Sequence, residues 1–295
     1  MMDGIIAVRK EKGYTSHDVV AKLRGILHMK KIGHTGTLDP DAEGVLPVVL
    51  GKATKLAEFL TDKDKTYEAV LHLGLETDTQ DMTGTVLKEL PVSVTEEQVR
   101  AAVSSFLGEQ QQIPPMYSAL KVNGRKLYEI AREGKTVERK PRTVFFHSIE
   151  IQDMELPLVK ISVTCSRGTY IRTLCHDIGK KLGCGACMEE LVRTRSGQFR
   201  LEDSLTLEEI REHQEQGDLD RYVMKIGDVL EEYPVLLCSC EMDRLLLNGN
   251  PLDGDMFEKE YHTGWVRMCT SSGAFIGLYQ WNPDEGRYCP VKMFL

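Results

Sequence analysis

A chain of 295 residues with 41% hydrophobic residues is long enough for one large domain or two, and it lacks the low-complexity tracts of a disordered protein. No apolar run approaches the ~18 residues that span a bilayer, and no signal-peptide pattern opens the chain, so we expect a cytoplasmic protein without a membrane partner. The net charge of −8 argues against nucleic-acid binding only as a whole-chain value, because phosphate groups respond to charge within roughly 8–10 Å.

The first predicted elements are a strand and a helix. Residues 5–8 form an apolar run typical of a strand. Ser16 is a good N-cap for the helix that follows, in which Val19, Leu23 and Ile26 fall on one stripe.

A tight loop around Asp39 comes next, in the segment Gly33-His34-Thr35-Gly36-Thr37-Leu38-Asp39-Pro40. The glycines allow a sharp turn, and Pro40 biases Asp39 toward an extended conformation. The apolar run at residues 45–50 then predicts a buried strand. Asp39 is therefore expected to be held still at the entrance to the core. By itself the pattern equally allows an aspartate that bonds its own backbone.

The middle of the chain alternates strands and helices. A short helix is predicted over residues 53–60 and a half-buried strand over residues 67–73. The oxygen-rich loop at residues 76–81 lacks the spacing of a calcium site and is predicted to be a solvated turn. Thr95 and Gln98 form a capping box that opens a helix extending to Leu107.

Charge is distributed unevenly along the chain. Residues 118–145 contain eight Lys or Arg against three Glu, a local charge of +5, and residues 160–200 contain eight against three acidic residues, again +5. Residues 201–260 contain five against seventeen, a local charge of −12, which masks the basic segments in the total. We expect residues 117–142, here named the basic arm, to project from the core and grip RNA; ordinary solvated helix faces are the alternative.

The remaining elements include a helix over residues 125–132 within the basic arm and two strands, at residues 144–151 and 158–165. A helix follows from Ile171 to Leu182, with Gly183 as its stop, and Thr206 caps an acidic helix. From about Tyr233, short apolar runs broken by turn residues predict a small β domain of ~60 residues.

Eight cysteines in a chain of this size are expected to be reduced thiols rather than disulfides. Cys184 and Cys187 could combine with Cys238 and Cys240 into a four-thiolate zinc site. Buried thiols are favoured over zinc, so no metal is expected.

Several motifs together resemble one protein family. Gly36-Thr37-Leu38-Asp39-Pro40, followed by Gly44 and Leu46-Pro47, closely resembles the signature of the TruB family of tRNA pseudouridine synthases. Four further motifs recur in the order of the family: Lys65-Thr66-Tyr67, Met116-Tyr117-Ser118-Ala119-Leu120-Lys121, Ser166-Arg167-Gly168-Thr169-Tyr170-Ile171-Arg172 and Lys181-Leu182-Gly183-Cys184-Gly185-Ala186. Glu11 departs from the pattern, since family members usually carry proline there.

The resemblance implies a fold and a domain organisation. The expected fold class is α/β (α+β), with a central mixed, largely antiparallel sheet flanked by helices. Residues 1–232 are expected to form the catalytic domain, including the basic arm. Residues 233–295 occupy the position of the small PUA-like RNA-binding module.

The resemblance also implies roles for site residues. Asp39 is expected to be the catalytic carboxylate, Arg172 the cation that keeps it ionised, and Tyr67 the ring that stacks on the target uracil and a candidate base for its C5 proton. His34 is expected to fill the gap left by the flipped base. The pocket and phosphate contacts are assigned to Tyr170, Leu191, Lys121, Arg125 and Lys126.

The implied reaction converts the T-loop uridine at tRNA position 55 to pseudouridine by base flipping. No cofactor and no obligate protein partner are expected, and a monomer is expected to bind the T-arm and T-loop. The alternatives are a guide-dependent or ribosomal-RNA-directed synthase of the same superfamily and a non-catalytic RNA-binding or RNA-folding module. Asp39-Pro40-Asp41 also resembles the site of aspartyl-phosphate phosphatases, but the apolar strand that such a site needs before the first aspartate is missing.

Overall fold

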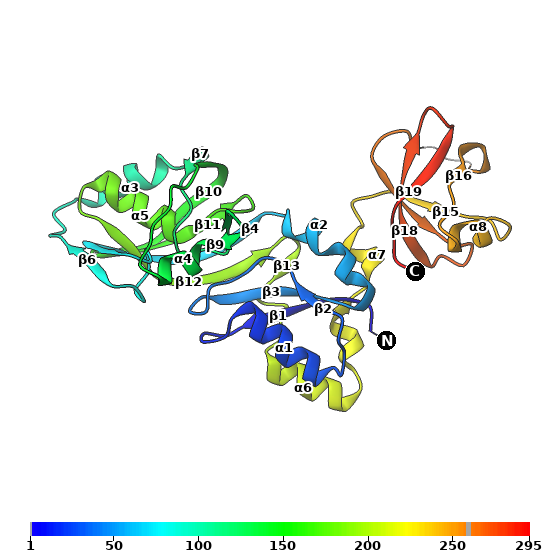
Figure 1. Cartoon of the computed structure of the whole chain (residues 1–295), viewed down its shortest axis with the longest axis horizontal. Coiled ribbons are helices and arrows are strands. Elements are labelled where there is room, and N and C mark those ends of the chain that lie inside the picture. Colours follow the sequence, from blue (N-terminus) through cyan, green and yellow to red (C-terminus); the bar gives the residue numbers. More distant parts are fainter. Residues whose placement is uncertain (1, 258–260) are drawn as a thin grey trace.

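The structure, a computed structural model, describes residues 2–257 and 261–295 and contains a large mixed sheet with flanking helices and a smaller second sheet (Figure 1). The second sheet lies at one end of an elongated molecule. Met1 of the predicted catalytic domain, and residues 258–260 of the predicted acidic segment and β domain, lie outside the described residues.

The large sheet has the strand order β14-β1-β3-β12-β4-β11-β10-β7, with β2 paired to β3 and β13 to β12. Its strands are β1 (Gly4–Lys10), β2 (Ile32–His34), β3 (Glu43–Leu50), β4 (Lys65–Leu73), β7 (Gly108–Gln112), β10 (Arg142–Glu155), β11 (Leu158–Cys165), β12 (Ala186–Ser196), β13 (Phe199–Arg200) and β14 (Val223–Met224). These strand pairs are antiparallel apart from β3 and β12, which run parallel where Glu43 and Gly44 meet Val192 and Arg193. The expected mixed, largely antiparallel sheet is confirmed.

Helices cover both faces of this sheet. They are α1 (Ser16–Ile26), α2 (Ala57–Thr61), α3 (Glu96–Ser104), α5 (Ile171–Leu182), α6 (Leu207–Gln216) and α7 (Ile226–Val229), with 3-10 turns η1 (Gly51–Leu56) and η2 (Leu219–Tyr222). Helix α4 (Leu127–Arg132) lies in the basic arm. Helices α3 and α5 pack on β4, β10, β11 and β12, while α1 and α6 pack side by side against β1 and β3. The predicted helix at residues 53–60 is divided between η1 and α2.

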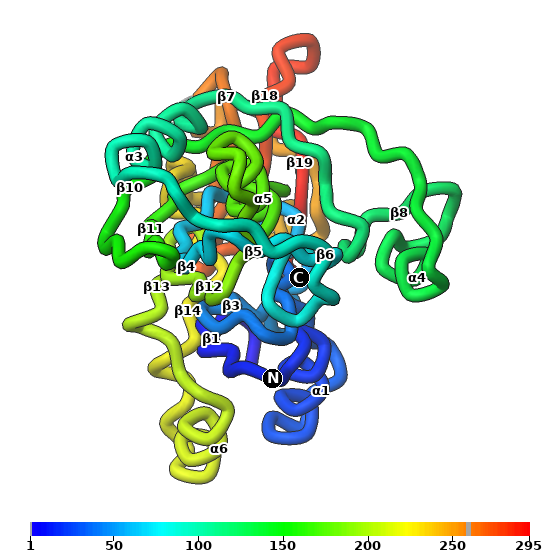
Figure 2. Tube along the Cα trace, turned by 90° about the vertical axis from the view of Figure 1, so that its left-hand side faces the viewer, coloured from blue at the N-terminus to red at the C-terminus, as the bar shows by residue number. Residues whose placement is uncertain are grey.

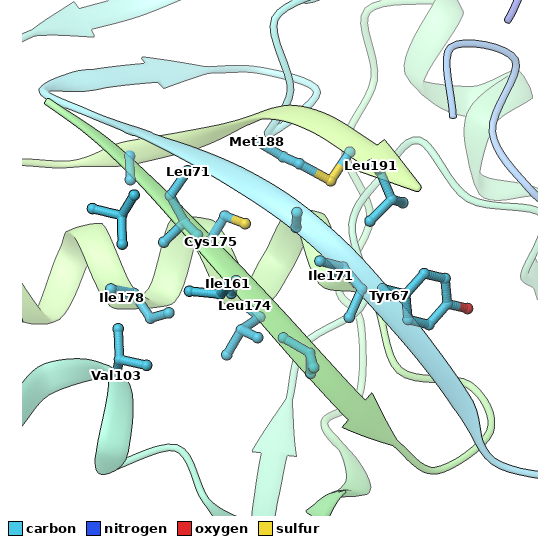
Figure 3. Close-up of a cluster of buried hydrophobic side chains, with 14 of the residues drawn as sticks. Tyr67, Leu71, Val103, Ile161, Ile171, Leu174, Cys175, Ile178, Met188 and Leu191 are labelled. Carbon is cyan, nitrogen blue, oxygen red and sulfur yellow. The ribbon is translucent and has the colours of Figure 1, made fainter. Parts of the chain in front are cut away.

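The hydrophobic cluster under α5 extends as far as Tyr67 on β4. Ile171, Leu174 and Ile178 are buried, so the predicted helical stripe is confirmed. Figure 3 shows these side chains facing Leu71 and Ile161 of the sheet, with Tyr67 at one end of the cluster and its hydroxyl pointing away from it. Burying this cluster fixes β4 against α5 and thereby places Tyr67.

Two helix termini differ from the prediction. Helix α3 ends at Ser104 rather than Leu107, although its Thr95 capping box is confirmed. The N-cap of α1 is Thr15, whose side chain accepts from Asp18 N, so the assignment of Ser16 as N-cap is wrong. Ser16 is buried instead, and its Oγ accepts a bond of 2.9 Å from Leu38 N. It ties α1 to the residue before Asp39.

The basic arm stands off from the sheet on two extended segments, as Figure 2 shows on the right of the view. It contains β8 (Lys121–Val122), β9 (Arg125–Lys126) and α4, so the predicted helix begins at Leu127 rather than Arg125. Met116, Leu127 and Ile130 give it a small core of its own. A short hairpin of β5 (Leu75–Thr77) and β6 (Val86–Glu89) lies elsewhere on the sheet edge.

The second sheet has the order β15-β17-β18-β19-β16. Its elements are β15 (Val235–Leu237), α8 (Asp243–Leu247), β16 (Leu252–Asp253), η3 (Gly254–Met256), β17 (Trp265–Cys269), β18 (Phe275–Asn282) and β19 (Arg287–Met293). It has its own buried core, but Leu278 and Phe294 also pack with Ile5 and Val229 of the first part. Within the described residues, no helix has the length and apolar character to cross a membrane.

At the parallel junction of β3 and β12, the protein should tolerate no side chain at Gly44 without a loss of stability. A Cβ added to Gly44 would lie 2.3 Å from Arg193 O, and the φ of Gly44 is +125°. We expect Gly44→Ala to lower the free energy of unfolding by about 2–4 kcal/mol. Gly217→Ala is the control, since Gly217 also has a positive φ but open space around its Cα. Urea denaturation should show that Gly217→Ala loses only about 1 kcal/mol. Equal losses for the two variants would refute the steric clash at Gly44 as the cause.

Candidate active site

A cavity of about 630 Å³ opens where the Asp39 loop, β4, β12 and the start of α5 meet. Asp39, Tyr67, Tyr170, Arg172 and Leu191 all line it, as does Arg193. The structure therefore brings together five of the predicted site residues from segments far apart in the sequence. The remaining predicted site residues do not line the cavity: His34, Lys121, Arg125 and Lys126.

Asp39 forms a two-point ion pair with Arg172. Arg172 Nε lies 3.0 Å from Asp39 Oδ2, and its Nη2 donates to Oδ1 at 3.3 Å. The Arg172 side chain is 6% exposed, whereas the Asp39 side chain is 42% exposed because it faces the open cavity. The guanidinium is thus held by the protein, and the carboxylate remains accessible to a ligand.

Two opposing effects set the protonation of Asp39. Desolvation by the surrounding protein raises the pKa of Asp39 above its ordinary value, and the Arg172 charge lowers it. Asp81 contributes a smaller upward effect on the same pKa. The Arg172 charge thus offsets part of the desolvation and favours the carboxylate over the neutral acid.

Arg172 is held by three further oxygens. Its Nη1 donates to Thr79 O at 3.0 Å and to Asp81 Oδ2 at 3.2 Å, and its Nη2 donates to Tyr117 O at 2.8 Å. The guanidinium therefore joins the Asp39 loop, the 76–81 turn and the base of the basic arm. Each contact compensates part of the cost of burying the charge.

The prediction that residues 76–81 form a solvated turn is wrong for Asp81. Its side chain is 15% exposed, and Asp81 Oδ1 accepts bonds of 2.6 Å from the hydroxyls of Thr79 and Thr83. The turn folds inward because a buried guanidinium recruits a second carboxylate. The sequence shows the cluster of oxygens but not its partner, which lies 91 residues away.

Lys10 binds the backbone of the Asp39 loop, a role that the sequence analysis did not predict. It is fully buried, and its Nζ donates to Ala42 O at 2.6 Å and Pro40 O at 3.0 Å. Burial lowers the pKa of Lys10 to about 8, and Asp39 raises it in turn. Together with Ser16 on Leu38, Lys10 fixes the loop on both sides of Asp39. Glu11, the departure from the family pattern, is exposed.

Aromatic and apolar side chains form the rest of the wall. Tyr67 on β4 is 9% exposed, and burial raises the pKa of its hydroxyl while Arg193 lowers it. Leu191 on β12 is buried opposite Ala69. Tyr170 precedes α5, and its backbone exchanges two hydrogen bonds with the Gln112 side chain, at 2.8 and 3.0 Å. A flat uracil-sized ring fits such a wall better than a charged group does.

His34 lies on β2, just before the loop. Its ring meets that of His17 edge-on, with the centroids 5.7 Å apart. Burial lowers the pKa of His34 to about 4, so the ring is neutral at pH 7. Its buried Nδ1 has no hydrogen-bond partner within the described residues.

The basic arm carries the three predicted phosphate contacts outside the cavity. Lys121 and Arg125 are exposed, and Arg125 forms an ion pair with Glu133. Lys126 is half-buried, with its Nζ over the Tyr128 ring.

The cysteines form no metal site in the part of the chain described. All eight are free, and no group of three or more His, Cys, Asp or Glu is arranged to hold a metal within residues 2–257 and 261–295. Cys184 and Cys187 lie in the first part of the chain and Cys238 and Cys240 in the second.

Comparison with known proteins places this site in a family. The description "TruB family pseudouridylate synthase (N terminal domain)" matches residues 24–171, and "tRNA pseudouridylate synthase B C-terminal domain" matches residues 172–231. The chain is 51% identical to tRNA pseudouridine synthase B of Lachnoclostridium phytofermentans, covering 100% of both chains. It is 43% identical to tRNA pseudouridine synthase B of Bacillus pumilus, covering 97% of this chain and 95% of the relative.

Solved structures agree. The chain matches the structure "Crystal Structure of a Cbf5-Nop10-Gar1 Complex" with a TM-score of 0.74 and 29% identity, covering 99% of this chain and 85% of that one. It matches an H/ACA RNP bound to a substrate RNA containing 2′-deoxyuridine with a TM-score of 0.73 and 27% identity, over 99% and 85% of the two chains.

The position of Asp81 makes it a structural requirement. Asp81→Ala removes an acceptor from a buried guanidinium and the carboxylate oxygen that accepts from the hydroxyls of Thr79 and Thr83, so we expect a loss of about 1–3 kcal/mol in the free energy of unfolding. Asp41→Ala, at an exposed position of the Asp39 loop, should change it by less than about 0.5 kcal/mol. The free energies of unfolding of both variants are measured by denaturation. Equal losses would show that Asp81 contributes no more to stability than the exposed Asp41 does.

Proposed function

This chain belongs to the TruB family of tRNA pseudouridine synthases, which are isomerases, and from that premise we propose that it converts the T-loop uridine at tRNA position 55 with Asp39 as the catalytic carboxylate. The observation that carries the proposal is the Asp39–Arg172 ion pair at an open cavity. Its accessible, ionised carboxylate is the group that a bond exchange at the sugar carbon requires.

The reaction balances without a cofactor. The C1′–N1 bond breaks, the base turns, and a C1′–C5 bond forms; one proton leaves C5 and one is taken up at N1. No electrons are gained or lost overall. Asp39 acts at the junction of sugar and base, by attack on C1′, by addition to uracil C6 or by removal of the 2′ proton.

The other predicted residues are assigned the roles that the family resemblance implies. Tyr67 stacks on the flipped uracil, while Tyr170 and Leu191 complete the pocket. His34 enters the gap in the T-loop; its neutral ring supports that role, because a charged ring would be costly between bases. A flipped base costs a few kcal/mol in lost stacking, which such an insertion partly restores.

The basic arm supplies the grip on the T-arm. Lys121, Arg125 and Lys126 contact phosphates, which position the RNA without reading its sequence. We assign residues 1–232 to the catalytic domain and residues 233–295 to a PUA-like RNA-binding domain, supported by the separate sheet and core of the latter. We further propose that a monomer acts on tRNA in the cytoplasm, a compartment in which eight free thiols are expected.

The guide-dependent alternative is favoured only by the match to the H/ACA RNP structure, at 27% identity, against 51% for the tRNA synthase relative. Incubating the protein alone with an unmodified tRNA transcript and mapping pseudouridine by position separates the two. We expect product at position 55 without any guide RNA. Product that requires a guide, or that forms elsewhere, would overturn the assignment.

Asp39→Asn keeps the shape of the side chain and removes its charge. We expect pseudouridine formation to fall by at least ~10³-fold while the tRNA dissociation constant changes by only a few-fold. Asp41→Asn is the matched control and should keep most activity. Turnover by the Asp39 variant at a rate near that of the control would remove Asp39 from the chemistry.

Arg172→Lys tests how the carboxylate is kept ionised. One ammonium cannot reproduce the two-point contact, so the pKa of Asp39 should rise and the acidic limb of the rate profile should move to higher pH. The rate measured from pH 5 to 8 should therefore recover partly as the pH rises. An unshifted limb would mean that Arg172 does not control this ionisation.

Neutralising Lys121, Arg125 and Lys126 with glutamine tests the grip. The slope of log affinity against log salt should become shallower by about 2–3, since each lost phosphate contact removes ~0.7–0.9. Glutamine at Arg200, Arg211 and Arg221, which are also exposed, changes the total charge equally and should leave the slope unchanged. Equal slopes for both triple variants would exclude the basic arm as the main contact.

A further inference from the structure

Arg193 is a buried cation with a structural setting that the proposed mechanism does not yet use. It is 1% exposed and lies on β12 at the parallel junction with β3. Its Nε donates to Val45 O at 2.8 Å and its Nη2 donates to Gly36 O at 3.1 Å. These two carbonyls stand on either side of Asp39 in the chain, so one guanidinium clamps both ends of the loop.

Gly44 lets the Arg193 backbone come this close. A Cβ on Gly44 would lie 2.3 Å from Arg193 O, whereas a Cβ on Gly36 would be in ordinary contact with Arg193 Nη1 at 3.4 Å. Gly36 is favoured for its backbone conformation instead, since its φ is +80°.

The guanidinium also faces Tyr67. Arg193 and Tyr67 are directly paired residues of the neighbouring strands β12 and β4, and both line the cavity. Burial raises the pKa of the Tyr67 hydroxyl, and the charge of the nearby Arg193 guanidinium is the largest effect that lowers it. In the described part of the chain, Arg193 forms no salt bridge with a carboxylate, and Tyr67 is the acidic group that acts on it most strongly.

A buried guanidinium without a carboxylate is costly, and two carbonyls compensate for only part of that cost. A cation placed in this way favours whichever neighbour can become an anion. The charged and titratable groups that face the Tyr67 hydroxyl are Arg193 from β12, Cys165 from β11 and Asp39 from the loop, and Lys65 lies two residues away on β4 itself. Arg193 is the one among them whose charge lowers the pKa of the hydroxyl, whereas Cys165 and Asp39 raise it.

We propose that Arg193 is a positioning residue of the isomerisation, which fixes the Tyr67 hydroxyl and both ends of the Asp39 loop and stabilises the Tyr67 phenolate that accepts the C5 proton. In this step Tyr67 first loses its proton to water. The C5–H bond then breaks, its electron pair restores the C5–C6 double bond of the joined base, and the proton goes to the phenolate oxygen. Tyr67 is thereby returned to the phenol form. The inference rests on the proposed function.

Arg193→Met and Arg193→Lys test the proposal, with Arg195→Met as the matched control. Arg195 lies on the same strand, where it donates to Thr66 Oγ1 at 3.1 Å and Gly197 O at 3.0 Å, and it does not line the cavity. The measurements are single-turnover pseudouridine formation from pH 6 to 10, tRNA affinity and thermal unfolding. For Arg193→Met we expect a loss of ~100-fold or more at pH 7 and a rate that goes on rising to higher pH than in the wild type.

Arg193→Lys should restore part of the rate that Arg193→Met loses and should return the pH–rate profile toward that of the wild type. Lysine restores the positive charge but not the planar set of guanidinium donors. Arg195→Met should stay within ~3-fold of the wild type, with an unchanged profile. A wild-type profile for Arg193→Met, or equal rate losses in the Arg193 and Arg195 variants that follow their unfolding temperatures, would overturn the proposal.

Should Arg193→Met fail to fold, Arg193→Lys is compared in the wild-type and Tyr67→Phe backgrounds. If Arg193 acts through the hydroxyl, lysine should slow the wild type but add little to the Tyr67→Phe defect, whereas fully additive losses would overturn the proposal. An active wild type with unaffected Arg193 variants refutes only this inference. A wild type that makes no pseudouridine refutes the proposed function and this inference together.

Discussion

The burial of Arg172 is the constraint from which the geometry of the site follows. A guanidinium that is 6% exposed must have its donors occupied, and here the Asp39 carboxylate, the Asp81 carboxylate and two backbone carbonyls occupy them. Meeting that requirement draws together a loop near the N-terminus, a turn after β5, the base of the basic arm and the first turn of α5. The same requirement leaves one carboxylate, Asp39, open to the cavity beside a fixed positive charge.

The features that local patterns predicted well are those whose determinants lie within a few residues. The capping boxes at Thr95 and Thr206, the buried stripe of α5 and the alternation along β4 all have this property. The overall sheet and the family were predictable because several motifs stand in order along the chain. The contact between Asp39 and Arg172 could be expected only through that family resemblance, since 133 residues separate them.

What local patterns missed was decided by distant partners. Ser16 and Thr15 are both good caps, and the choice fell to Thr15 because Ser16 is engaged by Leu38, 22 residues away. A lysine at the end of a strand is ordinarily exposed, and Lys10 is buried only because the carbonyls of the Asp39 loop surround its ammonium. Such partners are supplied by the tertiary fold, which no window of a few residues can display.

The backbone carbonyl of Tyr117 connects the active-site cavity with the basic arm. It accepts a hydrogen bond of 2.8 Å from the arginine beside Asp39, and it begins the segment that leads out to Lys121 and α4 (Figure 2). A movement of the basic arm that displaces Tyr117 would therefore also displace an acceptor of the Arg172 guanidinium. In the enzyme we propose, one backbone oxygen thus connects the segment assigned to RNA binding with the arginine that pairs with Asp39, so that a substitution far out on the basic arm would be felt at the site through the chain itself.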